Sequence, residues 1–347
     1  MLQKSDAFKR YDGLDFAKYL CAFLVITVHM SYFGKRYFEP LTRFAVPVFF
    51  MITGYFYSSI KKRNRESGQI KKMLVILLIS NLLYFLLKAV GYVLLNEPAP
   101  DFGSSLLSVK AWIDFLCFNE SFFSGHLWYL GAVLYVLVII LIVDKYSDRK
   151  KLYRLIPLLL LVNIICGNYS AILFGESLPL VLTRNFLFCG LPFFLLGDAL
   201  RQKERLLKQK QLVLMAVFAM LLTTVENYLL INSGKPFYSD CFIATPFMAY
   251  AVFVLFLENT DKFSNNCILS SIAKLGKSTS TTIYIVHPII KKLGGKIVSI
   301  LGEYVPSLGT VYHYVGPLVV LILCTVFACF LNLLTEKCSY FLQREVK

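Results

Sequence analysis

The stretch FAKYLCAFLVITVHM, residues 16–30, is apolar enough to lie in a lipid bilayer, yet it carries two ionisable side chains. Lys18 lies near its beginning and His29 near its end. Eleven residues are three helical turns plus about 20°, so both side chains project from one face, roughly 16 Å apart along the axis. Ionisable residues within a span are costly and are functional candidates by default. The stretch therefore predicts a membrane helix with a polar face.

The rest of the chain has the same apolar character. Of its 347 residues 57% are hydrophobic and 16% are charged, whereas about 25% are charged in a soluble domain. The apolar residues come in blocks of about twenty, the length that spans a bilayer core. We expect an all-α polytopic membrane protein with one membrane-embedded domain over residues 1–347. About ten transmembrane helices are predicted, near 14–33, 41–60, 70–95, 124–143, 153–173, 186–200, 211–231, 241–257, 281–301 and 314–334, with an interfacial helix at 103–118.

The basic residues predict the orientation of these helices. With the N-terminus inside, the inner segments hold 25 Lys and Arg residues, while the outer loops and outer helix ends hold 9. Because short cytoplasmic loops carry an excess of Lys and Arg, we expect both termini in the cytoplasm of a multi-pass protein of the cell membrane. The net charge of +15 lies in these loops and indicates no nucleic-acid partner. Nine scattered cysteines and four histidines without zinc-type spacing predict no metal site.

The Lys18/His29 pair suggests acyl transfer across a membrane, beside a purely structural interpretation. A cation at the cytoplasmic mouth can hold an anionic donor such as coenzyme A, and a buried neutral imidazole can accept a proton from a hydroxyl. Alternatively, Lys18 extends to the inner headgroups and His29 bonds a neighbouring helix. Asp15 lies three residues before Lys18, so a local ion pair is expected, which either positions Lys18 for binding the coenzyme A donor or simply neutralises it.

The segment GLDFAKYLCAFLVITVH (13–29) resembles the first-helix signature of the membrane acyltransferase-3 family, which is Leu-Asp-x-x-Arg and then an apolar run ending in His. VPVFFMITGYF (46–56) is similar to that family's Pro-x-Phe-Phe-x-x-Ser-Gly-Tyr run, with Thr53 in place of Ser. Three later segments also resemble family segments: HLWYLGAVLYVL (126–137), RNFLFCGLPFFLLG (184–197) and STTIYIVHPII (280–290). The resemblance therefore covers nearly the whole chain, in order.

This resemblance implies ten core membrane helices and an O-acyltransferase. Such an enzyme moves an acyl group, often acetyl, from cytoplasmic acyl-coenzyme A to a hydroxyl of an extracytoplasmic glycan or other cell-envelope acceptor, with no permanently bound cofactor. The family's catalytic base carries over to His29 and its first-helix arginine to Lys18. Lys18 is a departure, because lysine cannot grip a phosphate bidentately as arginine can. The implied partners are the lipid bilayer, acyl-coenzyme A (acetyl-CoA above all) and the hydroxyl acceptor.

Two of these segments also resemble the membrane domain of vancomycin-resistance serine racemases. They are NFLFCGLPFFLLG (185–197) and HLWYLGAVLYVL (126–137). The alternative function is therefore a membrane transport or substrate-delivery module for a small solute such as serine. Against transport, no inverted repeat of broken helices is evident.

Further site candidates lie on both sides of the predicted membrane. Arg63 and Arg65, in the cytoplasmic loop KKRNRESGQIKK (61–72), are candidates for binding coenzyme A phosphates or serve only topology and anionic-lipid contact. The outer candidates for acceptor binding are His126, Trp128, Arg184, Glu226 and His287.

The outer candidates also have structural alternatives, and Arg184 is otherwise an ordinary basic residue at a helix start. Trp128 is typical of the interfacial aromatic belt. An unpaired carboxylate such as that of Glu226 is energetically unfavourable inside a membrane span. We therefore expect Glu226 either to pair with Arg184 or Lys88, to orient His29, or to line a polar cavity. His287 precedes Pro288, which favours a kink or a broken helix.

Gly54 permits close helix packing or close approach of a ligand, and packing is the favoured interpretation.

Overall fold

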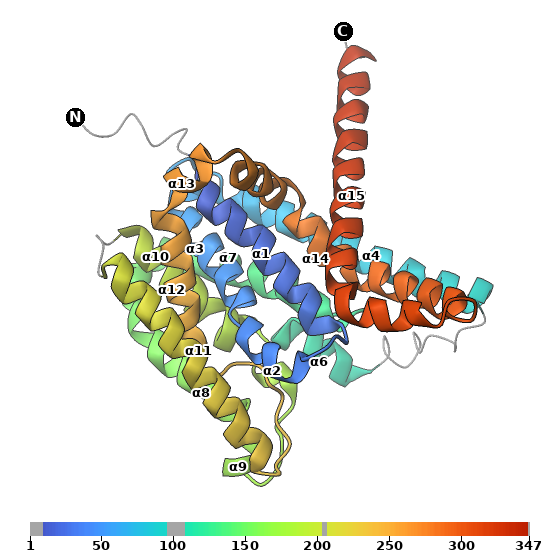
Figure 1. The fold of residues 1–347 in the computed structure, drawn as a ribbon. Helices are drawn as coiled ribbons and strands as arrows, with labels where there is room; N and C mark the ends of the chain where they lie inside the picture. Colours follow the sequence, from blue (N-terminus) through green and yellow to red (C-terminus); the bar gives the residue numbers. More distant parts are fainter. Residues whose placement is uncertain (1–9, 96–107, 203–206, 346–347) are drawn as a thin grey trace. The chain divides into compact units, whose positions relative to one another are not determined.

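The computed structural model describes residues 10–95, 108–202 and 207–345, and none of these residues lies in a β-strand. Figure 1 shows their arrangement as helices and connecting turns. The all-α prediction is confirmed. Chain contacts divide the protein into two compact units, which are described separately below. The first comprises Met1–Ala45, Gln209–Val217 and Ala249–Lys347, and the second Val46–Lys208 and Phe218–Met248.

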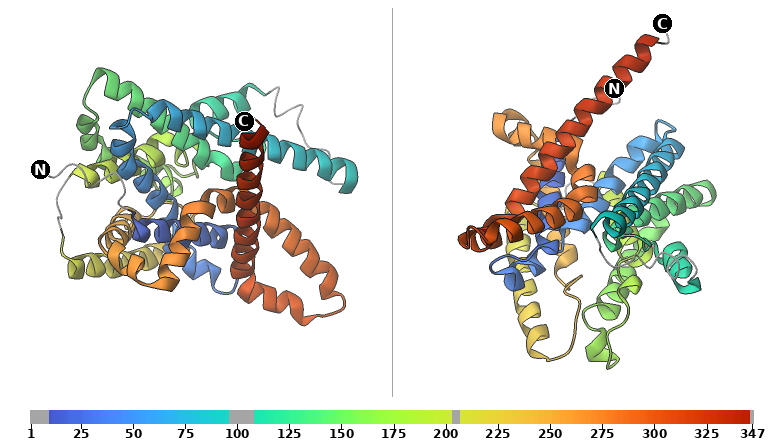
Figure 2. Two further views of the ribbon diagram at one scale, coloured as in Figure 1. Left: turned by 90° about the horizontal axis from the view of Figure 1, so that it is seen from above. Right: turned by 90° about the vertical axis from the view of Figure 1, so that its right-hand side faces the viewer.

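The first unit is built around its N-terminal helix. Helix α1 (Asp12–His29) packs along α14 (Cys267–Gly302), and α14 in turn packs against α15 (Ser307–Glu345). Figure 2 shows α14 and α15 running next to one another towards their short connection. Three short helices complete this unit: α2 (Lys35–Phe38), η1 (Pro40–Thr42) and α13 (Thr260–Asn265).

Glycine brings the backbones of α1 and α14 into contact. A Cβ atom at Gly276 would lie 1.9 Å from the carbonyl oxygen of Asp15, so no larger residue fits there without moving a helix. A Cβ atom at Gly13 of α1 would likewise lie 1.9 Å from the carbonyl oxygen of Phe256. These direct backbone contacts therefore fix the position of α1 near its N-terminal end.

The second unit holds the middle of the chain. Its helices are α3 (Ala45–Lys61), α4 (Glu66–Leu95), α6 (Val109–Phe118), η2 (Gly125–Leu127), α7 (Trp128–Tyr146), η3 (Arg149–Leu155), α8 (Ile156–Cys166), α9 (Ser170–Leu173), η4 (Leu180–Leu182), the π-helix η5 (Phe186–Gly190) and α10 (Leu191–Gln202). Two further helices, α11 (Gln209–Asn232) and α12 (Thr245–Glu258), have residues in both units, as does α3, whose first residue belongs to the first unit.

Helices α3 and α10 cross with their backbones in contact. A Cβ atom at Gly54 would lie 2.0 Å from the carbonyl oxygen of Phe194, and one at Gly197 would lie 2.0 Å from that of Met51. The packing interpretation of Gly54 is therefore confirmed. The crossing brings the last turns of α3 and α10 together, which matters for the polar network described below.

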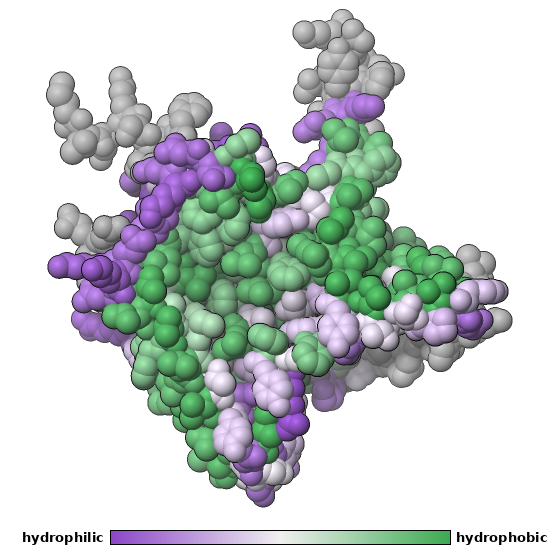
Figure 3. Space-filling model, viewed as in Figure 1, coloured by the Kyte–Doolittle hydropathy of each residue, from purple (hydrophilic) through white to green (hydrophobic). Residues whose placement is uncertain are grey.

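Four helices are long and apolar enough to cross a membrane. They are Glu66–Tyr92, Gly125–Tyr146, Gln209–Asn232 and Ser307–Lys337. Many of their large apolar side chains face outward, such as Leu214 and Phe218 of α11, which are 68% and 66% exposed. Figure 3 shows these surfaces as green over α11 and α15. The number of ten spans, the orientation of the termini and the single domain over residues 1–347 stay predictions.

Several elements differ from those predicted. The segment expected at 186–200 begins at Phe186 as predicted, but it begins as the π-helix η5, which Asn185 caps by accepting from the N–H groups of Leu187 and Phe188. Helix α14 begins fourteen residues before the expected 281 and continues through Pro288, so the helix is not broken there. Of the expected interfacial helix, residues 103–107 lie outside the described part, and Val109–Phe118 form α6 with Ser108 as its N-cap.

Candidate functional site

The first candidate pair, Lys18 and Asp15, lies near the N-terminal end of α1. Lys18 Nζ donates to Asp15 Oδ1 over 2.8 Å, so the predicted ion pair is formed. The side chain of Asp15 is nearly buried, whereas that of Lys18 is 23% exposed. An ammonium group has three N–H donors, so Lys18 can contact Asp15 and an anionic ligand at the same time.

The second candidate, His29, is the last residue of α1 and faces another histidine. The ring centroids of His29 and His287 are 5.1 Å apart, and the ring planes are tilted by 36°. His287 is fully enclosed in the first unit, while His29 is half-buried. The structure thus brings together two histidines that the sequence singled out separately, one on α1 and one on α14.

A hydrogen bond fixes the orientation of the His287 ring. Its Nδ1 lies 2.7 Å from the carbonyl oxygen of Tyr284, one helical turn earlier. Because a carbonyl can only accept, Nδ1 must carry the hydrogen. In the neutral ring the other nitrogen, Nε2, is then the acceptor.

The C-terminal end of α1 is held by a lysine that sequence reasoning did not single out. Lys35 Nζ donates to the carbonyl oxygen of Val28 over 2.9 Å, one residue before His29. A cation at this position is favourable, because the last carbonyls of a helix carry partial negative charge. Lys35 and Arg43 both form ion pairs with Glu39. The signal in the sequence was a basic residue shortly after the helix end.

Glu226 of α11 has partners other than those predicted. Its carboxylate accepts from the backbone N–H of Ile243, over 2.9 Å at Oε2, and from the hydroxyl of Tyr169 over 3.0 Å. Arg184, one of the expected partners, donates instead to Asp240 over 3.1 Å. The predicted pairing of Glu226 with Arg184 is therefore wrong, and Glu226 fastens the segment before α12 to α11.

The remaining outer candidates lie among aromatic and hydroxyl groups of the second unit. His126 Nδ1 is hydrogen-bonded to Ser124 Oγ over 2.7 Å, and its ring meets that of Tyr84 edge-on. The ring of Trp128 lies 6.3 Å from that of Phe50. These contacts position both rings; the acceptor-binding role of either residue stays a prediction.

The two cytoplasmic arginines lie where the chain turns from α3 to α4. Both Arg63 and Arg65 are exposed, and Asn64 between them has a positive φ of 51°. Exposed guanidinium groups suit phosphate contact, but they suit lipid headgroups equally well.

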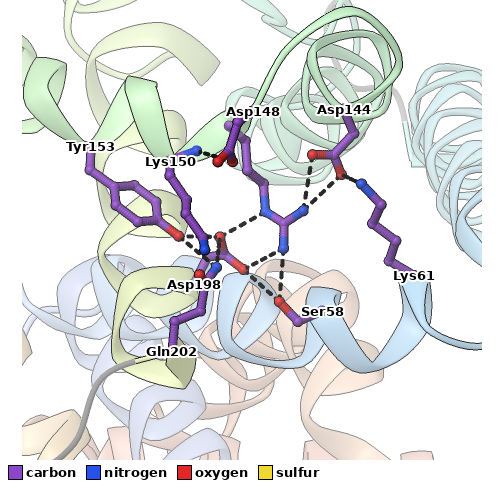
Figure 4. A network of polar contacts seen from close by, with 9 residues as sticks. Ser58, Lys61, Asp144, Asp148, Lys150, Tyr153, Asp198 and Gln202 are labelled. Carbon is purple, nitrogen blue, oxygen red and sulfur yellow. Dashed lines mark hydrogen bonds and ion pairs between the residues drawn. The ribbon is translucent and has the colours of Figure 1, made fainter.

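Sequence reasoning missed a buried ion network at the ends of α3, α7 and α10, which Figure 4 shows. Arg149 Nε donates to Asp198 over 2.8 Å, and its Nη1 donates to both oxygens of Asp144 over 2.9 Å. Ser58 accepts from Arg149 and donates to Asp198. Asp198 also accepts from two further side chains, Tyr153 and Gln202. The signal was a set of charged residues at the ends of apolar helices.

This network is electrically balanced. Lys61 pairs with Asp144 over 2.8 Å, so two cations meet two carboxylates. Burial alone would lower the pKa of Arg149, but the hydrogen bonds and charges of Asp198 and Asp144 outweigh it and raise that pKa above the ordinary arginine value. Arg149 therefore stays charged, and the network supports the structure rather than proton transfer.

Among residues 10–95, 108–202 and 207–345, no group of three or more His, Cys, Asp and Glu side chains is placed to hold a metal ion.

Comparison with known proteins adds family evidence. A family model described as an acyltransferase domain matches residues 11–336. Two curated proteins from Enterococcus faecalis, both named amino-acid racemase, are also similar. One is 26% identical over 326 residues, covering 86% of this chain and 43% of the relative, and the other is 24% identical over 226 residues, covering 58% and 30%. The chain thus spans less than half the length of these relatives. No solved structure matches it.

Proposed function

Because the chain belongs to the acyltransferase-3 family, we propose that it is an integral membrane O-acyltransferase of the cell membrane. It moves an acyl group, acetyl in the first instance, from cytoplasmic acyl-coenzyme A to a hydroxyl of an extracytoplasmic or cell-envelope acceptor. The observation that carries this proposal is the imidazole of His29, placed at the end of α1 against a second, buried imidazole.

In this proposal Lys18 lies at the donor end of α1. Its ammonium is held by Asp15 and remains partly exposed, so it can attract a coenzyme A phosphate. The helix separates Lys18 from His29 by roughly 16 Å, which a stretched pantetheine arm can bridge. Arg63 and Arg65 add positive charge on the same predicted side of the membrane.

His29 acts as general base in the reaction. The acceptor hydroxyl attacks the thioester carbonyl and its proton passes to a ring nitrogen of His29. The carbon–sulfur bond then breaks, the coenzyme A thiolate leaves with the bonding electron pair, and the proton on His29 neutralises it. A positioned base of this kind contributes about 10²–10⁴-fold to the rate.

The test is turnover of acetyl-coenzyme A by the purified protein in nanodiscs, with cell-envelope extract as acceptor. We expect His29→Ala to lower kcat by about 10²–10⁴-fold, while the protein stays folded. The matched control is His313→Ala, because His313 is an exposed histidine of α15 and is expected to retain full activity. A fully active His29→Ala protein would contradict the assignment of the base.

The second candidate function is transport or delivery of a small solute such as serine. The observation that favours it is the similarity to two proteins named amino-acid racemase. Uptake of radiolabelled serine into proteoliposomes, in the absence of any thioester turnover, would favour this function over acyl transfer.

A further inference from the structure

The sequence Tyr-Ile-Val-His-Pro, residues 284–288, places a proline where it frees one specific carbonyl. In an α-helix the N–H of residue 288 would donate to the carbonyl oxygen of residue 284. Pro288 has no N–H, and α14 nevertheless continues through this position. The carbonyl of Tyr284 therefore loses its usual donor inside a buried helix.

The side chain of His287 replaces that donor. Its Nδ1 lies 2.7 Å from the Tyr284 oxygen, within a bond that is buried at both ends. A buried carbonyl without a hydrogen bond is costly, so this contact stabilises one tautomer, with hydrogen on Nδ1. Neutral His287 then presents its Nε2 lone pair as an acceptor.

The ring of His29 is close enough to use this acceptor. A ring nitrogen lies about 1 Å from its ring centre, and a hydrogen bond between nitrogens spans about 3 Å. The centroid separation of 5.1 Å matches their combined length, so the two rings are close enough for a hydrogen bond between nitrogens.

We propose that His287 is a positioning residue for His29: Pro288 and the Tyr284 carbonyl fix its tautomer, and its Nε2 accepts the N–H of His29. The other nitrogen of His29 is thereby left unprotonated and directed to the acceptor hydroxyl. The logic is that of an orienting partner which holds a catalytic imidazole in one tautomer. The catalytic consequence rests on the proposed acyltransferase function, whereas the tautomer of His287 does not.

Two substitutions of His287 separate positioning from a structural role. The amide nitrogen of His287→Asn takes the place of Nδ1 and keeps the bond to Tyr284, but nothing replaces Nε2. In His287→Gln the amide oxygen reaches the place of Nε2 and keeps an acceptor. We expect kcat to fall by about tenfold to a hundredfold in the Asn variant and to be partly restored in the Gln variant, with KM for acetyl-coenzyme A unchanged in both. Equal activity of the two variants, or an Asn variant that outperforms the Gln variant, would overturn the proposal.

A second measurement needs no catalysis. The chain has only four histidines, so side-chain ¹⁵N NMR of histidine-labelled protein in nanodiscs resolves each tautomer, with His287→Asn identifying the His287 signals. We expect the hydrogen on Nδ1 of His287 in the wild type and a mixture of tautomers in Pro288→Ala, where a restored backbone N–H competes for Tyr284. Hydrogen on Nε2 in the wild type would refute the proposal whatever the activity. Hydrogen on Nδ1 of His287 in a protein without thioester turnover would support the proposed tautomer of His287 but would count against the proposed acyltransferase function.

Discussion

The Arg149 network of the second unit and the His29–His287 pair of the first unit both place polar side chains among packed helices. They differ in charge: the network consists of paired ions, whereas the pair consists of two imidazole rings. In the network, two carboxylates are matched by two cations, Arg149 and Lys61. The histidine pair instead brings together two imidazoles, and each has one ring nitrogen that can donate a hydrogen and one that can accept it. A compensated network suits stability, whereas a pair of imidazoles suits the movement of a proton.

The largest expected effect on stability comes from Arg149→Met. Two carboxylates would lose their shared guanidinium while Asp198 stays fully buried, and breaking a buried ion pair in this way costs about 3–5 kcal/mol. The midpoint of thermal unfolding in detergent should fall accordingly. Lys61→Met is the control, because Lys61 is 40% exposed and an exposed ion pair contributes about 1 kcal/mol or less.

His29→Ala, measured in the same unfolding assay, completes the comparison. We expect a smaller fall in the midpoint than for Arg149→Met, because His29 is half-buried at a helix end and its loss removes one neutral hydrogen bond, which contributes about 1 kcal/mol. If His29→Ala lowered the midpoint as much as Arg149→Met does, the contrast between a structural network and a chemical pair would be lost.

Gly54→Ala tests how the network is assembled. Ser58 of α3 and Asp198 of α10 meet because the two helices touch at Gly54, and an added Cβ would lie 2.0 Å from the Phe194 carbonyl. Overpacking of this kind costs about 1–3 kcal/mol, so the unfolding midpoint should fall. Gly68→Ala is the matched control, since nothing lies within 4 Å of its added Cβ. Equal midpoints for the two variants would show that the α3–α10 contact is not tight.

Glu226→Gln asks whether a buried carboxylate outside the network is also structural. In the glutamine an NH₂ group replaces one carboxylate oxygen, so the remaining oxygen can still accept from Tyr169 OH, but the 2.9 Å bond that Oε2 accepts from Ile243 N–H is lost. A loss of about 1–2 kcal/mol is expected, with unchanged KM for the hydroxyl acceptor. A raised KM for the hydroxyl acceptor at unchanged stability would instead indicate that Glu226 binds the acceptor.

The parts of this picture that the sequence predicted are local ones. The helical class follows from apolar blocks, the Lys18–Asp15 pair from i, i+3 spacing, and the packing role of Gly54 from the lack of a side chain. Pairings between distant segments were not predictable, because they depend on how helices cross. His29 and His287 were each recognised, but their contact was not. The predicted pairing of Glu226 with Arg184 was wrong, because the partners that Glu226 has, Tyr169 and the backbone N–H of Ile243, lie in segments without a recognisable motif.

The smallest expected effect concerns Lys18. Like the residues of the network it forms an ion pair, and like His29 it is only partly buried. Lys18→Gln removes one charge from the donor end of α1 and should raise KM for acetyl-coenzyme A by up to about fivefold, which corresponds to ~1 kcal/mol for a partly exposed charge contact. Lys18→Arg should lower KM, since a guanidinium can hold a phosphate bidentately. In both variants kcat should stay constant, because Lys18 is far from His29 along the helix. A fall in kcat at constant KM would place Lys18 with the chemical step and end its assignment to the donor.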